Sequence, residues 1–128
     1  MIKIVSESSV RMIVAGKLNG KTAYFLIDTG AVHGLIDKWA VKKFDISVDR
    51  RRELQMVGAG GSFKSYVVLT PLELAGRKVY QFCTADISGV VASIQRETGI
   101  KIAGLIGLNQ CRNLHISIDT DDHYISLE

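Results

Sequence analysis

One acidic residue stands at the end of an apolar run, in the sequence FLIDTGAVHGLID over residues 25–37. Asp28 follows apolar residues that are typical of a buried strand, and Thr29, Gly30 and Ala31 come directly after it. Glycine at position 30 lets the backbone approach the carboxylate closely and adopt angles that other residues avoid. Thr29 offers a hydroxyl that donates and accepts, and Ala31 leaves the turn uncrowded. We therefore predict that Asp28 is catalytic and that the next three residues support it.

A second segment with functional features is rich in glycine, in the sequence MVGAGGSFK over residues 56–64. Glycine weakens a strand interior and permits a mobile hairpin tip, which a lid over a bound polypeptide needs. The alternative interpretation is an ordinary glycine-rich hairpin loop. The residues predicted to cover the substrate are Val57, Gly58, Ala59, Gly60 and Gly61.

These segments, together with a third, resemble the retroviral-type (retropepsin-like) aspartic proteases. The first is FLIDTGA with the apolar pair Leu35-Ile36, the second is the glycine-rich segment, and the third is AGLIGL over residues 103–108. The resemblance extends from about Met12 to Leu127. It implies an aspartic endopeptidase that needs no cofactor, with Thr29 joining two active-site loops across a symmetry axis. Val32 departs from the viral relatives, which usually carry a polar residue there.

The chemistry of this family requires two carboxylates, and the chain supplies one. Two like charges that close cannot both ionise cheaply, so such a pair holds a single proton. The ionised member takes a proton from water while the protonated member polarises the scissile carbonyl. The sequence contains one Asp-Thr-Gly, and an internal repeat at an offset of 56 places Thr84 opposite Asp28. We therefore expect a homodimer in which each copy contributes Asp28.

The element pattern predicts a single all-β domain over residues 1–128, a closed or partly closed barrel of short strands with one or two helices. Similar hairpins are expected around residues 18–21 and 74–77, and Leu35-Ile36 aligns with Leu105-Ile106 at an offset of 70. Asp37 is the expected cap of one helix, and Ser88 and Gly99 the expected start and stop of the other. These helices make the chain more similar to the stand-alone bacterial-type members than to the minimal viral enzyme.

Composition excludes several other classes of protein. The chain is 47% hydrophobic and 23% charged with a formal net charge of +3, and the basic run Arg50–Arg52 lacks interleaved aromatic residues. We expect that run to be a solvated loop and expect no nucleic-acid partner. No apolar stretch or leader pattern suggests a membrane or secreted protein, so a cytoplasmic location is expected. His33 is expected in an exposed loop, and no metal is expected because the spacing of His115 and His123 matches no common metal signature.

Two other functions stay open on the sequence alone. The same fold could serve as a non-catalytic dimerising or peptide-binding module, although such a module has no evident need for a pair of repelling carboxylates. A strand that ends in Asp-x-Gly also occurs in nucleotide-binding folds. Those folds need longer chains and further phosphate motifs, and no such glycine pattern is present here.

Overall fold

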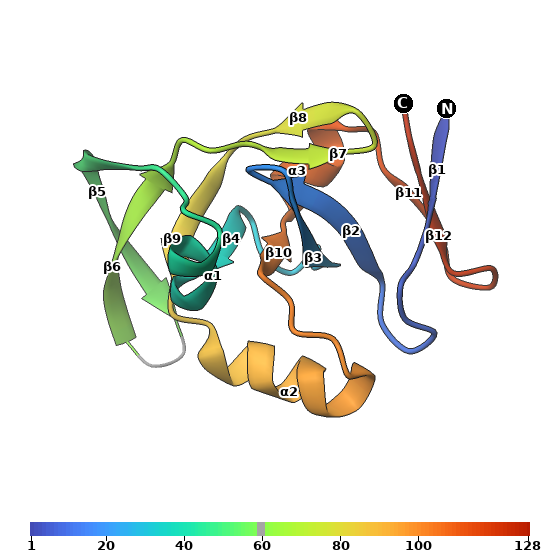
Figure 1. The fold of residues 1–128 in the computed structure, drawn as a ribbon, viewed down its shortest axis with the longest axis horizontal. Coiled ribbons are helices and arrows are strands. Elements are labelled where there is room, and N and C mark those ends of the chain that lie inside the picture. The colour runs from blue at the N-terminus through green and yellow to red at the C-terminus, as the bar shows by residue number, and fades with distance from the viewer. Residues whose placement is uncertain (59–60) are drawn as a thin grey trace.

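The structure, a computed structural model, describes residues 1–58 and 61–128 and is mostly β-sheet (Figure 1). Its strands are β1 (Ile2–Val5), β2 (Ile13–Leu18), β3 (Lys21–Ile27), β4 (Gly34–Asp37), β5 (Val48–Gly58), β6 (Gly61–Val68), β7 (Leu72–Leu74), β8 (Arg77–Val79), β9 (Phe82–Ala85), β10 (Gly104–Ile106), β11 (Ser117–Asp119) and β12 (Tyr124–Leu127). Its helices are α1 (Lys38–Lys43), α2 (Ser88–Thr98) and α3 (Leu108–Asn113). The predicted all-β class is confirmed, with one helix more than expected.

Nine strands form one sheet in the order β5-β6-β9-β4-β10-β3-β2-β7-β8. The two outer strands, β5 and β8, do not pair with each other, so within the described residues the sheet does not close into a barrel. At its centre β3 runs parallel to β10, β4 runs parallel to β9, and β4 and β10 are antiparallel. The strand that leads to Asp28 therefore lies among the central strands of the sheet.

The internal repeat predicted from the sequence is visible in the backbone. The β2–β3 hairpin turns through Asn19 (φ 49°) and Gly20 (φ 80°), and the β7–β8 hairpin turns through Ala75 (φ 51°) and Gly76 (φ 82°). Positive φ at both central residues is what a two-residue turn of type I′ requires. In the second half of each repeat, α1 and α3 begin 70 residues apart. The molecule is thus two related halves, with α2 as an extra element in the second.

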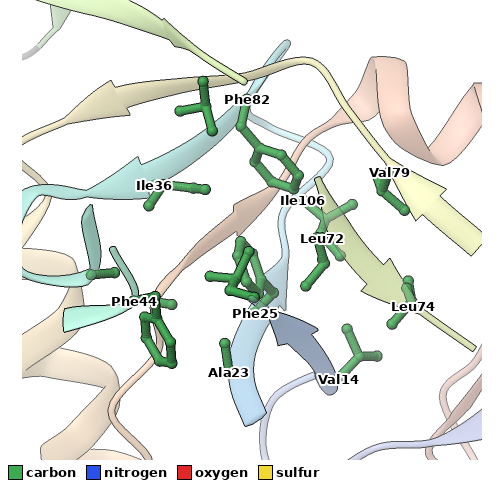
Figure 2. Close-up of a cluster of buried hydrophobic side chains, with 14 of the residues drawn as sticks. Val14, Ala23, Phe25, Ile36, Phe44, Leu72, Leu74, Val79, Phe82 and Ile106 are labelled. Carbon is green, nitrogen blue, oxygen red and sulfur yellow. The ribbon is translucent and has the colours of Figure 1, made fainter. Parts of the chain in front are cut away.

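The hydrophobic core lies between the central strands and the second hairpin. Phe25 and Phe82 are fully buried, and their ring centroids are 5.3 Å apart in a tilted arrangement. Figure 2 shows these two rings with Ile36 and Ile106 from the neighbouring strands and Leu72 from β7. Because each of the four central strands contributes a side chain, the core fixes the sheet that carries Asp28.

The helix boundaries confirm two predicted signals and correct one. The Asp37 carboxylate accepts a hydrogen bond from Trp39 N (3.4 Å) and caps α1, and Gly99 (φ 78°) ends α2. Ser88, however, is the first residue of α2, and the N-cap position belongs to Ile87, which makes no side-chain cap. The Asp86 carboxylate instead accepts a hydrogen bond from Ser88 N (3.2 Å), so a residue before the helix binds the first N–H of α2.

A separate three-stranded sheet joins the two ends of the chain. β12 lies between β1 and β11, and Ile2 is paired with Leu127 (Figure 1). The pairing of β1 with β12 joins segments far apart in the sequence, and the sequence pattern did not predict it. None of the helices in the described part of the chain is long and apolar enough to cross a membrane.

The β5–β6 hairpin extends beyond the segment predicted from the sequence. β5 begins at Val48, so the basic run Arg50–Arg52 lies in an exposed strand, which corrects the expectation of a loop. Asp49 pairs weakly with two of these cations, at 3.8 Å in each case. Gly58 and Gly61 face each other across the hairpin, while Ala59 and Gly60 fall outside the described residues.

Candidate active site

Asp28 is held at the end of β3 by bonds to its own turn and to β10. Its backbone N donates to Ile106 O (2.9 Å), so the parallel ladder between β3 and β10 extends to this residue. Its carboxylate Oδ1 accepts from Gly30 N (3.0 Å), and its carbonyl accepts from Ala31 N (3.2 Å). Asp28 as a residue is half-buried, and one oxygen of its carboxylate is oriented by a backbone N–H in an exposed hydrogen bond. Such an acid is fixed in direction and remains open on one side.

The structure supports one of the two reasons given for glycine at position 30. A Cβ built there would lie 3.1 Å from Asp28 Oδ1, which is tighter than ordinary contacts. Close approach to the carboxylate therefore favours glycine. The other reason is wrong, because the glycines with positive φ among the described residues do not include Gly30.

The loop after Asp28 is docked on the start of α3. Leu108 N donates to Ala31 O (2.7 Å), and Asn109 N donates to Val32 O (3.1 Å). The first N–H groups of a helix have no partner within it, so these loop carbonyls satisfy them. Val32 needs no polar side chain for this contact, because its backbone carbonyl makes the bond while its side chain stays 58% exposed. The departure at Val32 noted in the sequence did not predict this backbone contact.

Gln110 on α3 is a supporting residue that the sequence analysis missed. Its side chain is only 1% exposed, its Oε1 accepts from Gly107 N (2.8 Å), and its Nε2 donates to Tyr80 O (2.8 Å). It lies directly against Gly34, where an added Cβ would collide with the amide. Gln110 thereby joins the start of α3, the end of β8 and the start of β4. The only sequence signal was its place in the repeat, 70 residues after Ala40.

A groove lies between the segment after Asp28 and the β5–β6 hairpin. A cavity of about 380 Å³ is lined by His33, by Leu54 and Met56 of β5, and by Cys83 of β9. His33 is exposed, as predicted, and it also faces this cavity. The lining is mainly apolar, and it joins the Asp28 loop to the glycine-rich hairpin predicted to cover a substrate.

The opposite side of the Asp28 loop is exposed. Thr29 is exposed, and no hydrogen bond within the described residues uses its hydroxyl. It borders a second cavity of about 370 Å³, whose lining includes Leu108, Ile116 and Ile118. Ile118 is itself exposed. Thr29 of the loop therefore borders the same cavity as apolar side chains of α3, of β11 and of the segment between them, with Arg112 and His115 also in the lining.

The other half of the repeat contributes no second acid. Thr84, the counterpart of Asp28, lies in β9, where its hydroxyl accepts from Tyr66 N (2.9 Å) and its carbonyl accepts from Ser65 Oγ. It supports the β6–β9 contact and carries no carboxylate. Of these two counterpart positions, only the one at Asp28 carries a carboxylate.

Both cysteines are free and buried, as expected of small apolar residues. Burial raises the pKa of the Cys83 thiol, and a contact with Ser65 opposes this in part. Burial likewise raises the pKa of the Cys111 thiol. The thiol that lines the groove is therefore neutral at ordinary pH and offers an apolar surface rather than a nucleophile.

Comparisons with known proteins agree with this geometry. The family described as "Aspartyl protease" matches residues 14–110. The EIAV protease complexed with the inhibitor HBY-793 is 17% identical, with a TM-score of 0.59 over 85% of this chain and 92% of the other. The retroviral protease-like domain of Ddi1 from Leishmania major is 16% identical, with a TM-score of 0.58 over 92% of this chain and 88% of the other. The comparison with curated proteins gives no match.

The two structural relatives show that the fold is that of the retroviral proteases, and the family match spans the Asp28 loop, the β5–β6 hairpin and the first residues of α3. The fold implied by the resemblance is therefore confirmed. The chain belongs to the aspartyl protease family.

Proposed function

We propose that this protein is an aspartic endopeptidase that acts as a homodimer, with Asp28 of each copy forming one catalytic pair. One observation carries the proposal: the half-buried residue Asp28 ends a central strand with its carboxylate oriented by a backbone N–H, and Thr84 occupies its counterpart position. A second carboxylate must then come from another molecule, and an identical copy is the simplest source.

The exposed side of the Asp28 loop supports dimerisation. Thr29 and Ile118 are exposed and uncharged, and they line one cavity there together with Arg112 and His115. In a two-fold dimer the Thr29 hydroxyl would gain a partner from the second copy. Contact between the two loops would also remove both carboxylates from bulk water, which favours a single shared proton.

The groove on the other side supports a polypeptide substrate. The cavity between His33 and β5 offers apolar surface for a substrate side chain, and Val57, Gly58, Ala59, Gly60 and Gly61 would form the flap above it. Within the pair, the ionised Asp28 takes a proton from a bound water, and the protonated one polarises the scissile carbonyl. Gly30 holds the carboxylate in place through its backbone N–H.

The test compares Asp28→Asn with Asp86→Asn, a matched change at an exposed aspartate outside the site. Cleavage of an unstructured protein should fall at least about hundredfold for Asp28→Asn and stay unchanged for the control. Sedimentation at several concentrations should show that both variants still dimerise. Activity that survives in Asp28→Asn, or a protein that stays monomeric at high concentration, would refute the proposal.

The alternative is a non-catalytic module with the same fold that dimerises or binds peptides. It predicts dimerisation without cleavage at any pH. The endopeptidase predicts instead a bell-shaped pH–rate profile, because the fully protonated pair and the fully ionised pair are both inactive. A flat profile across the acidic range would count against the catalytic pair.

A further inference from the structure

A second groove lies apart from the Asp28 loop, between strand β8 and helix α3. A cavity of about 500 Å³ is lined by Arg77, Lys78 and Tyr80 on one side and by Gln110 and other α3 residues on the other. The two sides are tied together, because Gln110 Nε2 donates to Tyr80 O (2.8 Å) and Asn113 donates to the Gln81 side chain (3.0 Å). The groove is thus a fixed feature of the fold. It shares no lining residue with the cavity beside His33.

One wall of this groove is a free sheet edge. β8 is the last strand of the nine-stranded sheet and pairs only with β7 (Figure 1). A two-residue turn makes Leu74 and Arg77 a hydrogen-bonded pair, so the next pair, Glu73 and Lys78, is not hydrogen-bonded. The N–H and C=O of Lys78 therefore point away from β7. No hydrogen bond recorded within residues 1–58 and 61–128 uses either group.

Unpaired backbone groups on a sheet edge are a template for another strand. An extended peptide that lies along β8 could donate to Lys78 O and accept from Lys78 N, as one residue of an antiparallel ladder. Helix α3 forms the opposite wall at a distance that leaves the cavity open. This combination of a strand edge with a facing helix suits a peptide better than a compact small molecule.

The side chains around the groove indicate which peptide would fit. Arg77 and Lys78 are cationic, no acidic residue lines the cavity, and Tyr80 is 52% exposed. Glu73 lies across from Lys78 on β7 but is not part of the lining. The balance of charge along the edge therefore favours an acidic segment.

We propose that the groove between β8 and α3 binds an extended, acidic peptide segment as an added strand on β8. We take this segment to belong to the protein substrate, outside the bond that is cut, and that part of the inference rests on the proposed function. Protein substrates with such a segment would be held at two places, and short peptides only at the Asp28 groove.

The direct test is peptide binding to the full-length Asp28→Asn protein, which removes cleavage from the measurement. The probe is a fluorescein-labelled ten-residue peptide of alternating Glu and Val, and the comparison peptide has Lys in place of Glu. We expect only the acidic peptide to bind, as fluorescence anisotropy would show. Lys78→Pro removes the outward N–H of residue 78 and leaves the hydrogen bonds to β7 intact. Lys78→Ala removes the same side-chain charge but keeps this N–H. Binding to the Pro variant should be weaker than to the Ala variant by about two- to tenfold.

A charge reversal has a matched control in the first hairpin. Lys21 follows the Asn19-Gly20 turn as Arg77 follows the Ala75-Gly76 turn. Arg77→Glu should weaken binding of the acidic peptide, and Lys21→Glu should leave it unchanged. Equal binding to Lys78→Pro and Lys78→Ala, or equal binding of the acidic and basic peptides, would overturn the proposal.

Two further measurements remove ambiguity. Hydrogen exchange of the Lys78 amide should slow when the acidic peptide is added to protein that keeps Lys78. This measurement does not depend on a variant of β8 that could misfold. If Lys78→Pro instead converts a dimer into a monomer in sedimentation, the edge pairs with a second copy and the proposal is wrong. If the acidic peptide binds but the wild-type protein cleaves no substrate, the proposed endopeptidase is wrong and the proposed peptide groove is supported. If the wild-type protein cleaves substrate but the acidic peptide does not bind, the peptide groove is wrong and the endopeptidase is supported.

Discussion

The contact between Gly34 and Gln110 allows a quantitative test of how the Asp28 loop is supported. A methyl group at position 34 would collide with the Gln110 amide, which is buried and bonded to Gly107 N and Tyr80 O. Gly34→Ala should therefore force the amide to move, and overpacking of this kind costs about 1–3 kcal/mol. Because Gly107 is the N-cap of the helix whose Leu108 N donates to the Ala31 carbonyl, the proposed proteolytic activity should fall together with stability.

A change at Gln110 shows whether its amide causes the loss of stability expected in Gly34→Ala. Gln110→Ala leaves Gly107 N and Tyr80 O without their partner in a buried place, which costs about 2–4 kcal/mol for the two groups. In the double variant the methyl at position 34 meets no amide and fills part of the vacated space. Its cost should be close to that of Gln110→Ala alone, so the coupling energy should be about 1–3 kcal/mol.

The assay is urea unfolding of the wild type, the two single variants and the double variant. For a chain of 128 residues each kcal/mol corresponds to roughly 4 °C in Tm, so thermal melts give a second reading. Additive costs in the double variant would refute the proposed contact. A Gly34→Ala variant as stable as the wild type would refute it as well.

Four further predictions concern single residues. Gly30→Ala should lower kcat without loss of dimerisation, because the added methyl crowds Asp28 Oδ1; unchanged kcat would contradict this. Asp37, only 3% exposed, accepts from two backbone N–H groups, so Asp37→Ala should cost about 2–4 kcal/mol in urea unfolding and Asp37→Asn less. Ala75→Asn should add about 1 kcal/mol to the free energy of unfolding, since asparagine tolerates positive φ. Because burial raises the pKa of Cys83, its alkylation by iodoacetamide should be slow at neutral pH and faster as pH rises. The unfolded chain loses the thiol proton at a lower pH than the folded protein, so the free energy of unfolding should fall as pH increases above the ordinary thiol pKa.

The features of the fold that depend on neighbouring residues could be predicted from the sequence. The turn residues Asn19 and Gly20 predict the first hairpin, and Asp37 and Gly99 predict one helix start and one helix end. The Asp28 segment is recognisable because the catalytic role that we propose for this carboxylate needs a small set of neighbours in fixed order. These features are short-range, so a single chain is sufficient to find them.

The missed features depend on distant partners. β1 forms only because β12, more than a hundred residues later, pairs with it. α3 is six residues long and has no side-chain cap in the usual sense, and its first N–H groups are satisfied by the Ala31 and Val32 carbonyls. Gln110 resembles any surface amide in the sequence, and only the fold brings Gly34 and Tyr80 to it.

The pairing of Ile2 with Leu127 places the beginning and the end of the chain side by side (Figure 1). A short linker could therefore join them into a ring, and new termini could be opened between the exposed residues Ser9 and Val10, which lie between β1 and β2 and outside every hairpin. In such a circular permutant β1 and β12 would become neighbours along the backbone, and the slow search for a partner across the whole chain would become a local hairpin closure. Its folding should accelerate while the Asp28 loop stays as it is.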